Sequence, residues 1–191
     1  MVRVKLLDSF LATIPKYTHP TRGWFCFSLL FAGRLHLPYP SHLTWQVITD
    51  HAQAAAIFSS ITRSVVSQKA VLESGIREAE VLRECRWLLG TFTIRLALEE
   101  EIKPDEQLLR FYLIESPLFH KFEGFWRVKT ADDQQTRQCT VEHELWAKAA
   151  VPLPPPLSWF VRSMFESEVT KVLQELEEEV ARRDMHEDWI E

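Results

Sequence analysis

The chain has 191 residues, of which 46% are hydrophobic and 26% are charged, and this balance fits one soluble globular domain. Nothing in the length or composition calls for a second domain. The net charge is -5 and no long block of Lys or Arg occurs, which argues against a protein that binds nucleic acid through its phosphates. We therefore expect no nucleic-acid partner.

The three cysteines, Cys26, Cys85 and Cys139, are odd in number and widely spaced, and no CxxC pair is present. This pattern indicates reduced thiols in an intracellular, soluble protein and not a disulfide framework or a zinc site. The sequence also lacks a HExxH segment and a Gly-rich phosphate loop. No metal site is expected.

The N-terminal segment differs in charge from the rest of the chain. Residues 1–35 carry five basic residues against one acid, a balance of +4, which leaves -9 for the remainder. A basic, acid-poor start resembles an organellar targeting extension, with the chloroplast and the mitochondrion as candidate destinations. The apolar run at residues 24–32 is too short to span a bilayer, which takes about 20 residues. An extra strand and a segment that contacts a membrane surface are the alternatives.

Three elements are predicted in the first part of the domain. Residues 35–40 read as a strand that is ended by two prolines. Residues 41–50 predict a helix, and residues 52–61 predict a second, Ala-rich helix whose larger apolar side chains recur every three or four residues. Such a helix pair is typical of a connection that lies on the edge of a sheet.

The middle of the chain changes from a helical period to a period near two, beginning at Ser64. The clearest strand has Phe92, Ile94, Leu96 and Leu98 on one face. The strand-like segments are residues 81–87, 91–98, 108–114, 122–128 and 139–148. Sequential antiparallel neighbours with short turns form a meander, so we expect one antiparallel sheet.

A long amphipathic helix closes the chain. It is predicted to begin near Leu157, directly after a proline cluster at residues 152–156. An apolar stripe recurs along it at three- or four-residue spacing, through Val161, Phe165, Val169, Val172, Leu176 and Val180. Only this helix can cover the inner face of the sheet, so the join between sheet and helix is where a cavity is expected.

The order of these elements resembles the START-like superfamily of helix-grip domains, and within it the polyketide cyclase/dehydrase and coenzyme Q-binding families. The resemblance rests on residues 40–50, with their Trp and terminal Asp, on the segment Phe-Glu-Gly-Phe-Trp at residues 122–126, and on the proline-led closing helix. It implies an α+β helix-grip fold: a curved antiparallel sheet wrapped around a long C-terminal helix, with a short helix pair after the first strand. The domain would span residues 32–183, between an N-terminal extension at residues 1–31 and an acidic tail at residues 184–191.

The resemblance also implies an apolar cavity and side chains that line it. These ligand-binding candidates are aromatic residues and one Met, namely Trp87, Phe92, Phe111, Phe122, Trp126, Phe160, Met164 and Phe165. Plain core packing is the alternative for each of them. No cofactor is expected apart from a quinone or lipid held in the cavity.

One histidine is a candidate for acid-base chemistry. His143 shares a predicted strand face with Val141 and Leu145, where burial would shift its pKa. The alternative is a hydrogen-bonded core histidine, because the sequence identifies no acid partner for it.

The sequence therefore favours a binding protein over an enzyme. Its expected partner is a hydrophobic small molecule, lipid- or quinone-like, which it would transport, deliver or chaperone. The first alternative is a cyclase or dehydratase that acts on an aromatic or polyketide-like substrate. The second is an interaction module whose apolar N-terminal segment contacts a membrane or a partner.

Overall fold

An eight-stranded antiparallel sheet and one long helix make up most of the structure, which is a computed structural model of the chain. It describes residues 5–6, 28–72, 75–87, 90–130, 137–150 and 155–187, of which residues 5–6, 87, 155–162 and 187 are described by their backbone alone. The strands are β1 (Lys5–Leu6), β2 (Ser28–Leu37), β3 (Ile61–Val71), β4 (Arg77–Trp87), β5 (Gly90–Ile102), β6 (Glu106–Glu115), β7 (Phe119–Thr130) and β8 (Cys139–Ala149). The helices are α1 (Ser41–Thr49), α2 (Ala54–Ile57) and α3 (Pro155–Glu187).

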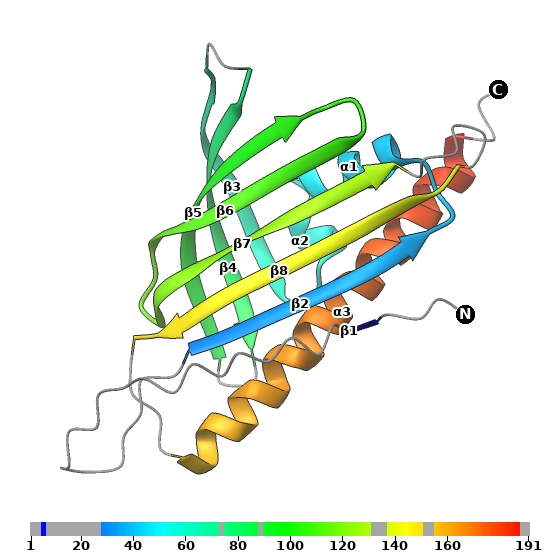
Figure 1. Cartoon of the computed structure of the whole chain (residues 1–191). Coiled ribbons are helices and arrows are strands. Elements are labelled where there is room, and N and C mark those ends of the chain that lie inside the picture. The colour runs from blue at the N-terminus through cyan, green and yellow to red at the C-terminus, as the bar shows by residue number, and fades with distance from the viewer. Residues whose placement is uncertain are drawn as a thin grey trace.

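The strands lie in the order β1-β2-β8-β7-β6-β5-β4-β3, and each neighbouring pair is antiparallel. From β3 to β8 each strand pairs with the next one along the chain, which is the predicted meander. Strand β2 pairs with β8 along its whole length, from Ser28 opposite Lys148 to Leu37 opposite Cys139. The helices α1 and α2 connect β2 to β3, at the far edge of the sheet (Figure 1).

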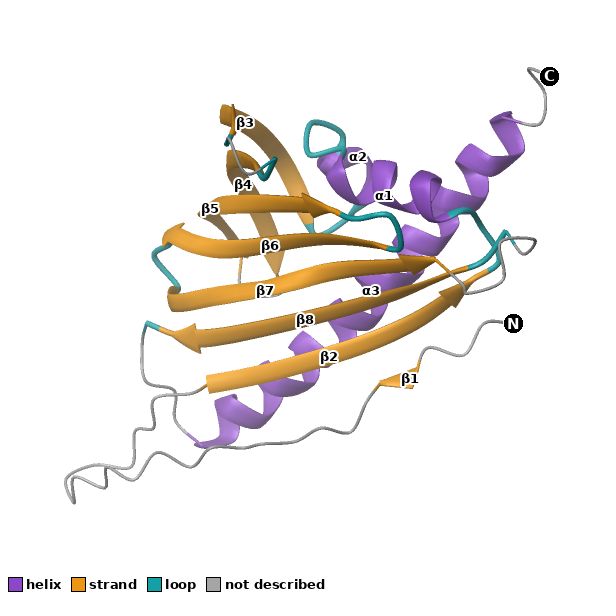
Figure 2. Ribbon diagram, turned by 45° about the horizontal axis from the view of Figure 1, so that its top comes forward, coloured by secondary structure: helices purple, strands orange, loops and turns teal. Residues whose placement is uncertain are grey.

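Helix α3 lies across the concave face of the curved sheet, as Figures 1 and 2 show. It packs against β2, α1 and α2. Leu35 of β2 and Val141 of β8 are fully buried, and so are Leu173, Leu176 and Val180 of α3. The α+β helix-grip architecture expected from the sequence is confirmed.

Two glycines allow close approaches at this core. A Cβ atom on Gly33 of β2 would lie 2.6 Å from Cδ1 of Leu173 in α3. A Cβ atom on Gly124 of β7 would overlap the backbone carbonyl of Glu144 in β8 and lie 2.7 Å from Cζ of Phe111. Because glycine has no side chain, α3 can lie close to β2 at Gly33, and the Phe111 ring can lie close to β7 at Gly124.

The C-terminal half of α3 is tied to the first part of the domain by polar contacts. The Arg183 guanidinium donates to the Asp50 carboxylate, after α1, at 3.0 Å and to Glu179 of its own helix at 2.7 Å. One turn before Glu179, the Glu175 carboxylate accepts a hydrogen bond at 3.2 Å from the backbone N–H of Ser59, which lies between α2 and β3. These contacts hold the helix against the α1–α2 segment.

Strand β3 forms one edge of the sheet, and β4 is its one neighbour among the described strands. The pairing of β3 with β4 changes register between Ile61 and Arg63 and again between Val66 and Gln68. Such irregularities bend a strand and interrupt its ladder of hydrogen bonds.

Several boundaries differ from the sequence-based expectation. Strand β2 begins at Ser28, so residues 28–31, assigned to the N-terminal extension, belong to the sheet. The second helix was expected over residues 52–61 but spans only Ala54–Ile57, because Ile61 already pairs with Cys85 as the first residue of β3. Helix α3 runs on to Glu187, into the segment expected to be an acidic tail. The rest of the N-terminal extension, apart from β1, lies outside the described residues.

Candidate functional site

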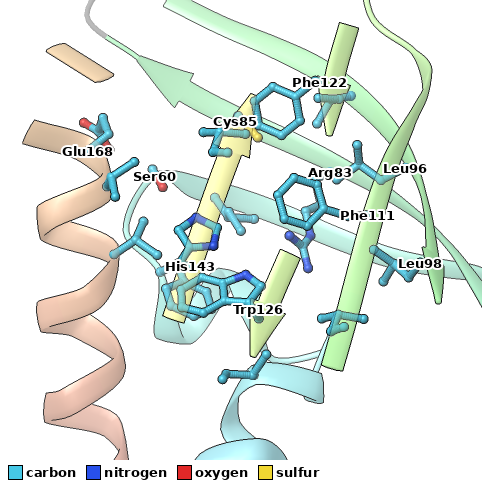
Figure 3. A pocket seen from close by; sticks show the side chains of 18 of the residues that line it. Ser60, Arg83, Cys85, Leu96, Leu98, Phe111, Phe122, Trp126, His143 and Glu168 are labelled. Carbon is cyan, nitrogen blue, oxygen red and sulfur yellow. The ribbon is translucent and has the colours of Figure 1, made fainter. Parts of the chain in front are cut away.

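A cavity of about 150 Å³ lies between the inner face of the sheet and α3 (Figure 3). Most of its wall is aliphatic or aromatic and comes from every strand from β4 to β8, with α3 on the opposite side. The lining residues are Ile48, Phe58, Ser60, Ile61, Arg83, Cys85, Phe92, Ile94, Leu96, Leu98, Leu109, Phe111, Phe122, Trp126, His143, Leu145, Phe165, Glu168, Val169 and Val172. The period-two pattern of the strands produces this wall, because alternate side chains share the concave face.

The aromatic side chains of the wall contact one another. The ring of Phe122 lies 5.9 Å from that of Phe111 and 5.2 Å from that of Phe119, measured between centroids. Phe165 of α3 stacks on Phe31 of β2, with centroids 5.5 Å apart and ring planes 7° from parallel. Aromatic contacts of this kind hold the rings in fixed positions and form a continuous apolar surface.

His143 lies within this apolar surface. Its ring stacks on that of Trp126 at a centroid distance of 3.8 Å, and Nδ1 lies 3.0 Å from the backbone carbonyl of Phe125. Since a carbonyl only accepts, Nδ1 carries the proton and donates it, which leaves Nε2 as an acceptor. Burial lowers the pKa of His143 to about 4, against the opposing effect of the Phe125 hydrogen bond, so the imidazole is neutral at neutral pH.

Arg83 and Cys85 of β4 bring two polar side chains to the same wall. Burial raises the pKa of the Cys85 thiol to about 11, while the charge of Arg83 opposes this change. Burial also lowers the pKa of Arg83, whose Nε is inaccessible to solvent and has no hydrogen-bond partner. Cys85 is therefore a neutral thiol at neutral pH and supplies no negative charge to the guanidinium.

Glu168 places a carboxyl group on the α3 side of the cavity. Its Oε2 atom is inaccessible to solvent and has no hydrogen-bond partner. Burial raises its pKa, and the nearby Glu175 acts in the same direction, whereas Lys171 acts against both. The apolar cavity thus has a cation on its sheet wall and an acid on its helix wall.

The sequence of this domain matches a family model described as polyketide cyclase / dehydrase and lipid transport, over residues 37–184. The chain belongs to this family. Among curated proteins, none matches the chain's sequence.

Solved structures with the same fold are distant in sequence. The Zhui aromatase/cyclase from Streptomyces sp. R1128 has a TM-score of 0.67 at 15% identity, over 82% of this chain and 96% of that one. A START superfamily protein from Mycobacterium smegmatis has a TM-score of 0.64 at 13% identity, over 80% and 97%. A STAR-related lipid transfer protein from Xanthomonas axonopodis has a TM-score of 0.63 at 13% identity, over 84% and 99%. At these identities the likeness shows the polyketide cyclase / dehydrase fold alone.

The structure places five of the eight predicted wall residues of this family member in the lining of the cavity: Phe92, Phe111, Phe122, Trp126 and Phe165. Met164 is buried, with 7% of its surface exposed, but does not line the cavity. The side chains of Trp87 and Phe160 lie outside the described residues. The candidate base, His143, lines the cavity as well.

Sequence reasoning missed the polar members of the wall. Arg83 and Cys85 lie within the strand predicted at residues 81–87, and Glu168 lies on the predicted closing helix, but the sequence identifies none of the three as a site residue. The alternation in β4 does place Arg83 on the face of the fully buried Val81, which was the available signal. Among the described residues, no group of His, Cys, Asp and Glu side chains could hold a metal ion.

Proposed function

We propose that the protein binds a hydrophobic small molecule, lipid- or quinone-like, in the cavity between the sheet and α3, and serves in its transport, delivery or chaperoning. The observation that carries this proposal is the apolar, aromatic-lined cavity itself, since such walls are typical of small-molecule sites. Support comes from the family, whose description includes lipid transport, and from the fold shared with a STAR-related lipid transfer protein.

The volume of the cavity limits what fits without rearrangement. A cavity of about 150 Å³ is close in size to one that holds a benzene molecule, whereas pockets for drug-sized ligands measure about 300–1,000 Å³. One ring or a short acyl segment fits the conformation described here. A whole lipid or quinone requires movement of side chains or of α3.

The proposal is tested with a neutral fluorescent probe, N-phenyl-1-naphthylamine, and with mass spectrometry of lipids that copurify with the protein. Binding should be lost when Val172→Phe fills the cavity from α3, because Val172 lines it. Val71→Phe is the matched control, since Val71 is 72% exposed at the sheet edge. Absence of probe binding and of copurified lipid from a well-folded wild-type protein would reject the proposal.

An enzyme of cyclase or dehydratase type is the second candidate, and the position of His143 in the cavity is the observation that favours it. A fixed Nε2 acceptor could receive a proton from a bound substrate. However, a general base works best with a pKa near the operating pH, and the pKa of His143, about 4, makes it a weak base. Turnover of a polyketide-like substrate that falls about 10²-fold or more in His143→Gln would favour the enzyme.

Peripheral membrane contact and organellar targeting stay predictions of the sequence. None of the described helices is long and apolar enough to cross a membrane. Liposome binding is the test of membrane contact, and the deletion should remove residues 24–27 alone, since residues 28–32 belong to β2. Localisation of the chain with and without residues 1–27 tests the targeting prediction.

A further inference from the structure

The cavity contains one positive charge without a visible counter-charge. Arg83 lies on the inner face of β4, and Figure 3 shows its guanidinium pointing into the cavity, as do the rings of Phe111 and Trp126. Among the described residues, no carboxylate forms an ion pair with it, and its Nε has no hydrogen-bond partner. The remaining lining near it on β5, Leu96 and Leu98, is aliphatic.

Such an arrangement is unfavourable for the protein alone. A buried charge is tolerated when it is paired and hydrogen-bonded, and an unpaired one carries a large desolvation penalty. An arginine stays protonated at every physiological pH, so Arg83 cannot avoid this penalty by losing its proton. The neighbouring thiol, Cys85, is neutral and does not compensate it.

The one carboxyl group of the lining, Glu168, is not a substitute partner. It belongs to α3, on the opposite wall, and the charges that act on it are those of Lys171 and Glu175. Among the described residues no ion pair joins Glu168 to Arg83, and the Oε2 atom of Glu168 has no hydrogen-bond partner.

We infer that the natural ligand carries a carboxylate, which Arg83 binds inside the cavity, while the apolar part of the ligand lies against the aromatic wall. This inference rests on the proposed function and names the chemical class of its ligand: an amphiphile with one acidic group. A planar guanidinium accepts a carboxylate in a bidentate pair, and one guanidinium neutralises one negative charge. A phosphate monoester, with up to two charges, would leave an excess negative charge in an apolar wall.

The test compares decanoate with decan-1-ol, which has a similar chain but no charge, by displacement of N-phenyl-1-naphthylamine at about pH 8, where the acid is ionised. The wild-type protein should bind decanoate at least about tenfold more tightly than the alcohol. Arg83→Met should abolish this preference and still bind the neutral probe. Arg86→Met is the matched control, because Arg86 is exposed on the opposite face of the same strand.

Stability gives a second, ligand-independent measurement. Replacement of a partly buried charge that has no counter-charge by an apolar side chain of similar length should raise the urea midpoint of the Arg83→Met variant above that of the wild type. A lower midpoint would mean that Arg83 has a structural partner and would overturn the inference.

The binding outcomes separate this inference from the proposed function. If the probe binds but the wild type holds decanoate and decan-1-ol equally, or if Arg83→Met keeps the preference, the carboxylate assignment is wrong and the apolar-ligand function stands. Tighter binding of decyl phosphate than of decanoate would also overturn the assignment. If neither the probe nor the two ten-carbon compounds bind, both proposals fail together.

Discussion

The two halves of α3 face the same sheet, but one half packs in the core and the other borders the cavity. In the C-terminal half, Leu173, Leu176 and Val180 are fully buried against the sheet and the first helix pair. In the N-terminal half, Glu168 and Val169 lie on a cavity wall. One helix with one continuous stripe therefore supplies both the tightest part of the core and one wall of the site. We predict that mutations in the two halves affect stability and ligand binding separately.

Removal of α3 after Pro156 should have the largest effect, because it takes away both halves. Each large apolar side chain that the stripe buries contributes about 1.5–3 kcal/mol, and the five from Phe165 to Val180 together match a typical net stability of about 5–15 kcal/mol. The truncated chain should show no cooperative unfolding transition by circular dichroism. A cooperatively folded, ligand-binding truncation would mean that the helix is dispensable for the fold.

A single truncation in the C-terminal half should weaken the fold without changing the site. Leu176→Ala creates a cavity at a fully buried position and should lower the free energy of unfolding by about 2–5 kcal/mol, measured by urea denaturation. The affinity of the folded fraction for a neutral apolar probe should stay within about twofold of the wild type, because Leu176 does not line the cavity. A large loss of affinity would show that the two halves are coupled.

The stability of the cavity wall should depend on pH through His143. Its pKa is about 4 in the folded protein and about 6.5 in an unfolded chain, so the unfolded state binds more protons between these values. Above about pH 6.5 the histidine is neutral in both states, and the free energy of unfolding has its full value. As the pH falls to about 4, this free energy decreases by about 3 kcal/mol. His143→Gln should remove this part of the pH dependence and leave probe binding nearly intact. Equal pH profiles of the two proteins in urea denaturation would contradict the buried, neutral histidine.

Phe165→Ala, in the N-terminal half, should have the smallest effect on stability and a clear effect on binding. Phe165 is only 3% exposed and stacks on Phe31, but part of its ring borders the cavity. The expected loss of stability is about 1–3 kcal/mol. Truncation of a fully packed Phe to Ala costs more, about 3–5 kcal/mol. Probe affinity should fall at least about fivefold. If stability falls as far as in Leu176→Ala while affinity is unchanged, Phe165 belongs to the core and not to the site.

The sequence predicts the strands of this protein better than it predicts where the elements meet. The apolar residues from Phe92 to Leu98 alternate because one face of the strand is buried. In β5 these residues are buried, as the alternation predicts. Ile57, Phe58 and Ile61 are spaced as in a helix, but Ile61 opens β3, because pairing with Cys85 overrides the local pattern. Such a choice depends on a strand more than twenty residues away, which no local window contains.

The same limit applies to the site. An aromatic residue on an inward face is easy to predict, and five of the expected wall residues do line the cavity. A charged residue within a strand is normally assigned to solvent, so the sequence does not predict Arg83 as a wall residue. The alternation with Val81 places Arg83 on the inner face of β4, but only the folded arrangement shows that this face borders a cavity.

The irregular pairing of β3 has a consequence for self-association. The sheet stays open, with the cavity between it and α3, and an open sheet leaves an edge whose backbone groups could pair with another copy of the chain. Along β3 that edge is interrupted by the two changes of register and carries the exposed charges of Arg63 and Lys69. Both features make the β3 edge a poor template for an incoming strand. The β3 edge of the open sheet therefore does not offer a straight, uncharged strand for polymerisation.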